Sequence, residues 1–107
     1  MEEQNRYQEF LSKWIKIYVK LLEEDEKVEE LAVRIGSRIP FNFAKPQTIS
    51  AACVAIASAE LKKPKTPKDM IGITGISMRS FIGLKNYIRK KGWDRNAVED
   101  LHLAVSS

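Results

Sequence analysis

Apolar residues recur every three or four positions along the first part of the chain. From Tyr7 to Leu22 they occupy the i, i+3, i+4 and i+7 positions that line one face of an α-helix. That face consists of Tyr7, Phe10, Leu11, Trp14, Tyr18, Leu21 and Leu22. Ile15, Ile17 and Val19 widen it, which predicts contacts with neighbouring elements on more than one side. We therefore expect a first helix that packs an aromatic-rich face into the core.

The acidic run Glu23–Glu26 ends this pattern and precedes a second one. Asp25 is a suitable N-cap, because its carboxylate can accept hydrogen bonds from the exposed amides at a helix start. We interpret the run as capping and solvation, not as a metal site. The apolar face of the second helix is formed by Val28, Leu31, Ala32 and Ile35. Gly36 predicts its end, and Ile39–Phe43 predicts a linker anchored by two aromatic side chains.

The segment from Gln47 to Ala59 carries no charge and contains five alanines. A helix that is apolar on nearly all sides belongs in the middle of a bundle. Alanine side chains are short, so they let the axes of neighbouring helices approach closely. Cys53 lies in this helix, and we interpret it as a small buried apolar residue instead of a reactive thiol.

A short capped helix is predicted directly after the lysine-rich segment Glu60–Lys65, in which Pro64 prevents the central helix from continuing. Thr66 at the N-cap, Pro67 at the first helical position and Asp69 at the third follow a pattern in which a hydroxyl and a carboxylate satisfy the exposed amides reciprocally. The core face of this helix is formed by Met70, Ile71 and Ile73.

Thr74–Ser77 predicts the turn into the next helix. Gly75 can adopt a positive φ, Ile76 can fill the core, and Ser77 can cap the helix after the turn. The inward face of that helix is formed by Phe81, Leu84 and Ile88, and its outward face by Arg79, Gly83, Asn86, Arg89 and Lys90. This is the arrangement of a helix-turn-helix.

Gly92 stops that helix, and Trp93 is expected to pack back onto the bundle. Asp94 then begins a short last helix. Its inward residues are Ala97, Val98, Leu101 and Val105. The pattern over the whole chain therefore predicts an all-α protein with a single domain over residues 1–107.

Composition narrows the possible chemistry. With 107 residues and 44% hydrophobic content, one core is expected. No apolar run approaches the roughly 20 residues of a membrane span, so we expect a soluble intracellular protein without membrane association. One cysteine, Cys53, and one histidine, His102, supply neither a disulfide nor a four-ligand zinc site. No nucleophile–base arrangement or phosphate-binding loop is present, and we expect no catalysis, metal or cofactor.

The net charge of +4 is distributed unevenly. Residues 1–40 carry 7 Lys or Arg against 9 Asp or Glu, whereas residues 60–95 carry 10 against 3. A cationic surface of this kind attracts polyanions, although it can also serve only to solvate a helix.

The charge and the predicted turn together give a set of candidate DNA contacts. Arg79 and Ser80 occupy the first turn of the second helix, where side chains reach base edges in the major groove, and Ser77 precedes them. Lysine and arginine side chains on either side would hold phosphates. These candidate phosphate contacts are Lys62, Lys63, Lys65, Lys68, Lys85, Arg89, Lys90 and Lys91.

The series Pro46-x-x-Ile49-x-Ala51-Ala52-x-x-x-Ile56-Ala57-Ser58, then a lysine-bearing turn, Thr66-x-x-Asp69-Met70-Ile71 and Gly75-Ile76-Ser77, resembles the second cyclin-like repeat of the transcription factor IIB family, including archaeal transcription factor B. The resemblance runs from about Tyr7 to Trp93. It implies a cyclin-like five-helix bundle whose last two core helices form a helix-turn-helix, followed here by a short C-terminal helix. It also implies a role in transcription initiation, in the cytoplasm of an archaeon or the nucleus of a eukaryote. The implied partners are double-stranded promoter DNA, TATA-binding protein and RNA polymerase.

The chain departs from the family pattern at the residues that would read DNA. Arg79 and Ser80 fall on the valine and threonine recognition positions of the family, and Ser80 keeps the hydroxyl. Ile82 falls where the family usually has a base-contacting arginine, and Lys85 where it often has tyrosine. The cysteines of the family's zinc ribbon and its other repeat are missing from these 107 residues. A second hypothesis stays open, in which the domain is a cyclin-like adaptor that binds a protein partner without sequence-specific DNA recognition.

Overall fold

A computed structural model describes the backbone of residues 2–40, 42–61 and 65–106, and the side chains of residues 5–40, 42–61 and 65–99. Within these ranges the chain forms six α-helices and no strand, which confirms the expected all-α class. The helices are α1 (Glu2–Leu21), α2 (Glu26–Ser37), α3 (Pro46–Glu60), α4 (Pro67–Thr74), α5 (Met78–Lys91) and α6 (Trp93–Ser106).

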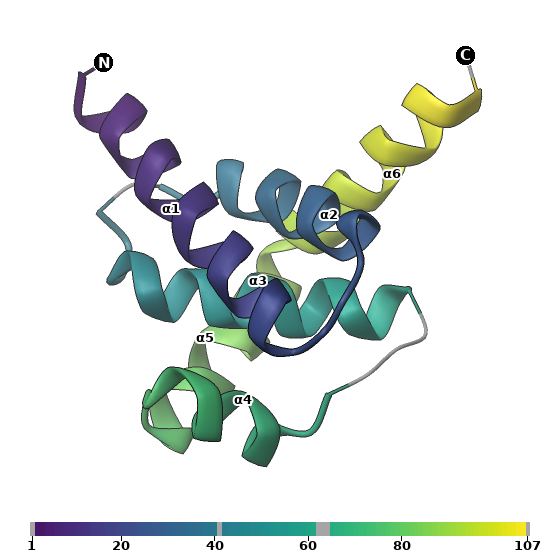
Figure 1. The fold of residues 1–107 in the computed structure, drawn as a ribbon. Coiled ribbons are helices and arrows are strands. Elements are labelled where there is room, and N and C mark those ends of the chain that lie inside the picture. The colour runs from purple at the N-terminus through teal and green to yellow at the C-terminus, as the bar shows by residue number, and fades with distance from the viewer. Residues whose placement is uncertain (1, 41, 62–64, 107) are drawn as a thin grey trace.

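Helix α3 is the centre of the bundle and packs against α1, α2, α4 and α5 (Figure 1). Helix α6 packs on α2 and α5. The radius of gyration of 12.7 Å is close to the roughly 13 Å expected for a folded chain of this length. Helix α4 lies at the end of the molecule away from both chain termini (Figure 1). The α4–α5 pair is therefore presented on the side of the bundle opposite the termini.

The first helix begins at Glu2, before the first residue of the apolar pattern. Its first turn is polar, so an apolar pattern cannot reveal where the helix starts. Tyr7, Leu11, Ile15 and Tyr18 form its buried face. The expectation that Phe10 and Leu21 share this face is wrong, since their side chains are 52% and 57% exposed. At 3.6 residues per turn, both lie roughly 90° around the helix from the centre of the buried face. The apolar pattern in α1 is thus two adjacent stripes, of which one is buried.

The close approach of α1 and α2 depends on Gly36. We expected this glycine to end the second helix, but α2 continues through Ser37 and Gly36 is buried inside it. A Cβ atom at Gly36 would overlap Leu11 Cδ2. The Tyr7 hydroxyl also donates a hydrogen bond to the Gly36 carbonyl oxygen, at 3.0 Å. Gly36 is therefore a contact between helices and not a stop signal.

Helix α3 is buried along most of its length, as its uncharged sequence predicts. Every residue from Ile49 to Ser58 is buried, including Ala51, Ala52, Ala55 and Ala57, and α3 packs against both α1 and α2. Cys53 is fully buried, and burial raises the pKa of its thiol. Its surroundings agree with the interpretation of Cys53 as a structural apolar residue.

The last helix differs from the expectation in length. Helix α6 has 14 residues, as many as α5, so it is not a short appendage. Trp93 packs back onto the bundle as expected, with its ring against those of Phe43 and Tyr87. The side chains of Phe41, Leu101 and Val105, which were also expected to face inward, lie outside the described residues.

In the described part of the chain, no helix has both the length and the apolar character that a membrane crossing requires.

Candidate functional site

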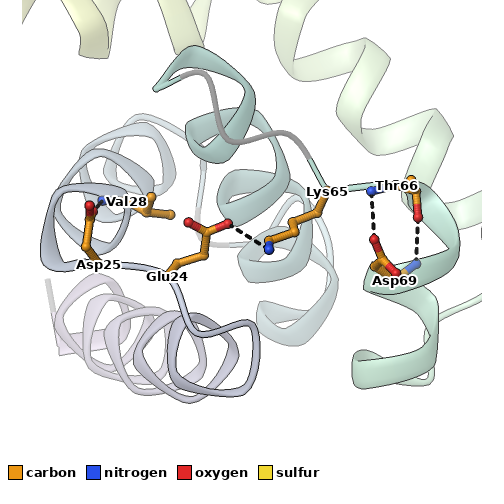
Figure 2. A network of polar contacts seen from close by, with 6 residues as sticks. All are labelled: Glu24, Asp25, Val28, Lys65, Thr66 and Asp69. Carbon is orange, nitrogen blue, oxygen red and sulfur yellow. Dashed lines mark hydrogen bonds and ion pairs between the residues drawn. The ribbon is translucent and has the colours of Figure 1, made fainter.

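The start of α4 is fixed by two reciprocal hydrogen bonds (Figure 2). The Asp69 backbone amide donates to Thr66 Oγ1 at 3.1 Å, and the Thr66 amide donates to Asp69 Oδ2 at 3.2 Å. Hydrogen bonds from Thr66 hold the pKa of the Asp69 carboxyl below its ordinary value. The capped start predicted from Thr66, Pro67 and Asp69 is confirmed.

The turn between α4 and α5 is also held by side-chain hydrogen bonds. Gly75 adopts a left-handed conformation with φ of 72°, and its amide donates to the Ile71 carbonyl oxygen at 2.9 Å. Thr74 Oγ1 donates to the Met70 carbonyl oxygen and accepts from the Ile76 amide. Ser77 Oγ caps α5 by accepting a hydrogen bond from the Ser80 amide at 3.2 Å. These bonds fix the direction in which α5 leaves the turn.

Burial of one face of α5 determines which face is presented to solvent. Phe81, Leu84 and Ile88 point into the core, as their spacing predicts. The opposite stripe is exposed and consists of Arg79, Gly83, Asn86 and Lys90. Helix α5 contains five cationic residues and no Asp or Glu, so this surface is entirely basic or neutral. A basic face of this kind can bind a polyanion.

The remaining cations of α5 differ in how freely they can reach outward. The Lys85 ammonium lies over the Phe81 ring at 5.5 Å from its centroid, and the Lys91 ammonium lies over the Tyr87 ring at the same distance. Burial lowers the pKa of Lys85, and the neighbouring Arg89 lowers it further. Arg89 is exposed. Lys85 therefore serves partly as packing for its own helix.

Lys65 lies in an ion pair with Glu24. Its Nζ is 3.5 Å from Glu24 Oε1, and the Glu24 side chain is only 3% exposed (Figure 2). Glu24 Oε1 accepts no hydrogen bond within the described residues, so Lys65 supplies its electrostatic compensation. Lys65 directly precedes the N-cap of α4, and the exposed Lys68 lies in its first turn, so neither belongs to the α5 stripe. Lys62 and Lys63 lie outside the described residues.

An open groove with a volume of about 750 Å³ runs along the flank of α5. One wall is the segment from Phe43 to Thr48 at the start of α3, and the other extends from Thr74 to Tyr87. Of the candidate residues, Ser77 and Ser80 line this groove, and the Ser77 and Ser80 hydroxyls are 2.9 Å apart and hydrogen-bonded. The structure therefore brings these two serines together beside a concave surface.

Sequence reasoning did not identify the opposite wall of the groove. Lys45, Gln47 and Thr48 line it, about 30 residues before the turn that they face. The only local signal is the Lys45–Pro46 start of a helix, and nothing in that pattern relates it to α5. Their proximity results from the packing of α3 against α5.

No group of three or more His, Cys, Asp or Glu side chains in the described part of the chain is arranged to hold a metal ion. Comparison of the chain with models of protein families, with curated proteins and with solved structures finds no match.

Proposed function

We propose that the chain is a DNA-binding cyclin-like domain of the transcription factor IIB type, and that α4 and α5 act as a helix-turn-helix with α5 in the major groove. The observation that supports this proposal best is the outward face of α5. It carries Arg79, Asn86 and Lys90 on one exposed stripe, and α5 has no acidic residue. Because Ser77 caps α5 and Phe81 anchors it, the stripe has a fixed direction.

In this proposal Arg79 reaches base edges from the first turn of α5. An arginine can donate two hydrogen bonds to the O6 and N7 atoms of a guanine. Gly83 lies in the middle of the same stripe, and nothing within 4 Å would meet a Cβ there. An open glycine allows the DNA surface to approach the α5 backbone. Arg89 and Lys90, near the end of the helix, then hold phosphates.

The resemblance to the second cyclin-like repeat supports the same function, with promoter DNA, TATA-binding protein and RNA polymerase as the partners. Ile82 and Lys85 differ from the family at positions that read the usual promoter element. In addition, the Lys85 ammonium lies over Phe81, within its own helix. We therefore propose binding to promoter DNA with a sequence preference different from that of the family.

Fluorescence anisotropy with labelled duplex DNA across a salt series tests the proposal. We expect measurable affinity at low salt, and a fall in log affinity with log salt of about 0.9 for each phosphate contact. Arg89→Glu with Lys90→Glu should abolish binding, while Lys16→Glu with Lys20→Glu, which makes the same charge change at exposed positions of α1, should retain most of it. Absence of binding at low salt, or equal loss in both variants, would contradict the proposal.

The adaptor hypothesis remains a second candidate because the groove beside α5 is open and includes the partly exposed rings of Phe43 and Tyr87. An adaptor would bind its protein partner equally well after the double charge reversal on α5. A pulldown with TATA-binding protein, with and without DNA, distinguishes the two functions. Retention that requires DNA favours the helix-turn-helix, and retention unaffected by the reversal favours the adaptor.

A further inference from the structure

A second apolar stripe on α1 is largely exposed, and only Trp14 within it packs against the core. Phe10, Ile17 and Leu21 are 52%, 36% and 57% exposed, and Trp14 lies half-buried between them. Three of the six large hydrophobic residues that are exposed in the described part of the chain therefore belong to this one stripe. Concentration of exposed apolar side chains on one surface is typical of an interaction site.

The spacing of the stripe is that of a coiled-coil seam. Its four residues follow one another at intervals of four, three and four positions, which is the alternation of the two apolar positions in a heptad repeat. From Phe10 to Leu21 the seam extends about 16 Å at 1.5 Å per residue. A seam of this length and spacing fits about three turns of a second helix.

Cations border the seam at every heptad. Arg6, Lys13 and Lys20 recur at intervals of seven residues, all three are exposed, and none forms an ion pair with a carboxylate in the described part of the chain. If Trp14 and Leu21 are placed at heptad position a, these three cations occupy position g. In coiled coils, charged side chains at position g form salt bridges with the partner helix and so select its charge. Heptad position e, which follows Phe10 and Ile17, is occupied by Leu11 and Tyr18, and both of these side chains are buried in the core. The seam therefore has one basic border and one border closed by its own bundle.

We propose that this seam of α1 binds an amphipathic helix of a partner protein that carries Asp or Glu along one edge of its apolar face. The basic border is complementary to such an edge, and the apolar side chains of the seam can interdigitate with those of the partner. This surface does not involve α5 and does not depend on the proposed DNA-binding function.

Two other occupants fit the seam less well. In an antiparallel pair of two copies of this chain, the borders of Arg6, Lys13 and Lys20 would face each other and repel. An anionic membrane would match the charge, but a membrane-surface helix buries a broad apolar face. The exposed part of this stripe covers only about 60° of the helix, narrower than the roughly 100° of an ordinary apolar face.

A pair of labelled synthetic peptides tests the proposal. Each has three heptads with Leu at both apolar positions, and the flanking positions are all Glu in one peptide and all Lys in the other. We expect the Glu peptide to bind the full chain at least tenfold more tightly than the Lys peptide in fluorescence anisotropy. Lys13→Glu with Lys20→Glu should reverse this preference, whereas Lys16→Glu, an exposed position of α1 away from the seam, should leave it unchanged.

The variant Phe10→Ser with Leu21→Ser separates binding from folding, because both side chains are exposed. We expect it to lose at least tenfold in affinity for the Glu peptide while its circular dichroism and thermal midpoint stay unchanged. Equal binding of both peptides, or unchanged binding by this variant, would overturn the proposal. So would binding to phosphatidylserine vesicles without binding to the peptide, or a concentration-dependent dimer in sedimentation that this variant abolishes.

Discussion

Glu24 and Lys65 form an ion pair that connects the α1–α2 turn to the segment leading into α4 (Figure 2). The Glu24 side chain is almost fully buried, and the preceding Glu23 adopts a left-handed φ of 56°, which is uncommon for a residue other than glycine. Lys65 is thus a structural contact that holds the start of α4 against the bundle. This ion pair adds to the packing of α4 on α1 and α3, which also holds α4 at the end of the molecule.

Replacing Lys65 with alanine should destabilise the fold more than replacing Lys68. Lys65→Ala leaves the buried Glu24 carboxylate without compensation, which we expect to cost about 1 to 3 kcal/mol. Lys68→Ala removes the same charge at an exposed position three residues along and should change stability by less than about 0.5 kcal/mol. Urea denaturation of both variants measures the difference. Equal losses would show that the ion pair contributes nothing specific.

Alanine substitutions at Gly36 and Gly83 should have opposite effects on stability. At Gly36 the added methyl group would overlap Leu11 in the core, and such overpacking costs about 1 to 3 kcal/mol. At Gly83 the space is open and the backbone is helical, so alanine should stabilise α5 by about 0.5 to 1 kcal/mol. Thermal denaturation of both variants measures the two effects.

The same pair of variants also bears on the proposed DNA contact. If DNA approaches the α5 backbone at Gly83, Gly83→Ala should weaken DNA binding although it raises the thermal midpoint. A stabilised variant with unchanged DNA affinity would mean that this glycine does not face the ligand.

The stability contributed by Asp69 should be lost in acid. Its folded-state pKa lies below the ordinary value of 3.8, so the unfolded chain takes up the proton first as the pH falls. The contribution is therefore complete above about pH 5 and disappears as the pH falls through the folded-state pKa. Asp69→Asn should lower stability at pH 7 and show a smaller further loss at pH 3, as measured by urea denaturation. Glu9→Gln, at an exposed position of α1, should follow the acid dependence of the unmodified chain.

Arg79 and Lys90 should differ in what they contribute to DNA binding. Arg79→Lys keeps the charge but loses the planar fork, so we expect an unchanged salt dependence and weaker discrimination among duplex sequences. Lys90→Ala should weaken binding to all sequences alike and reduce the salt slope by about 0.9. Anisotropy on a panel of duplexes measures both quantities. The opposite result, in which Lys90 controls sequence discrimination, would mean that the C-terminal end of α5 contacts the base edges.

Local structure could be predicted from the sequence because it depends on neighbours in the chain. The reciprocal hydrogen bonds of Thr66 and Asp69, the left-handed Gly75 and the cap at Ser77 each involve residues within four positions of one another. The buried face of α5 could be predicted from periodicity, because its apolar residues recur on one side of the helix. The burial of α3 could be predicted from its uncharged, apolar composition. Those patterns determined the presence of the helices, the caps at Thr66 and Ser77, and the direction of the α5 stripe.

Packing between distant helices decided what the pattern leaves open. The sequence of α1 offers two apolar stripes, and only its contacts with α2 and α3 place Leu11 inside and Phe10 outside. Gly36 predicts a helix end, yet α2 continues for one more residue and Gly36 packs against Leu11. Similarly, the sequence offers Lys65 as a phosphate contact, whereas the structure places it in an ion pair with Glu24 of the α1–α2 turn.

The sequence by itself determined the all-α class, the capped α4–α5 turn and the basic character of α5, because propensity, capping and charge act over short distances along the chain. The tertiary structure alone decided which apolar stripe of α1 is exposed, that Lys65 is paired with Glu24, and that Lys45 and Ser77 line the same groove. Each of these depends on burial, and burial is set by which helices meet.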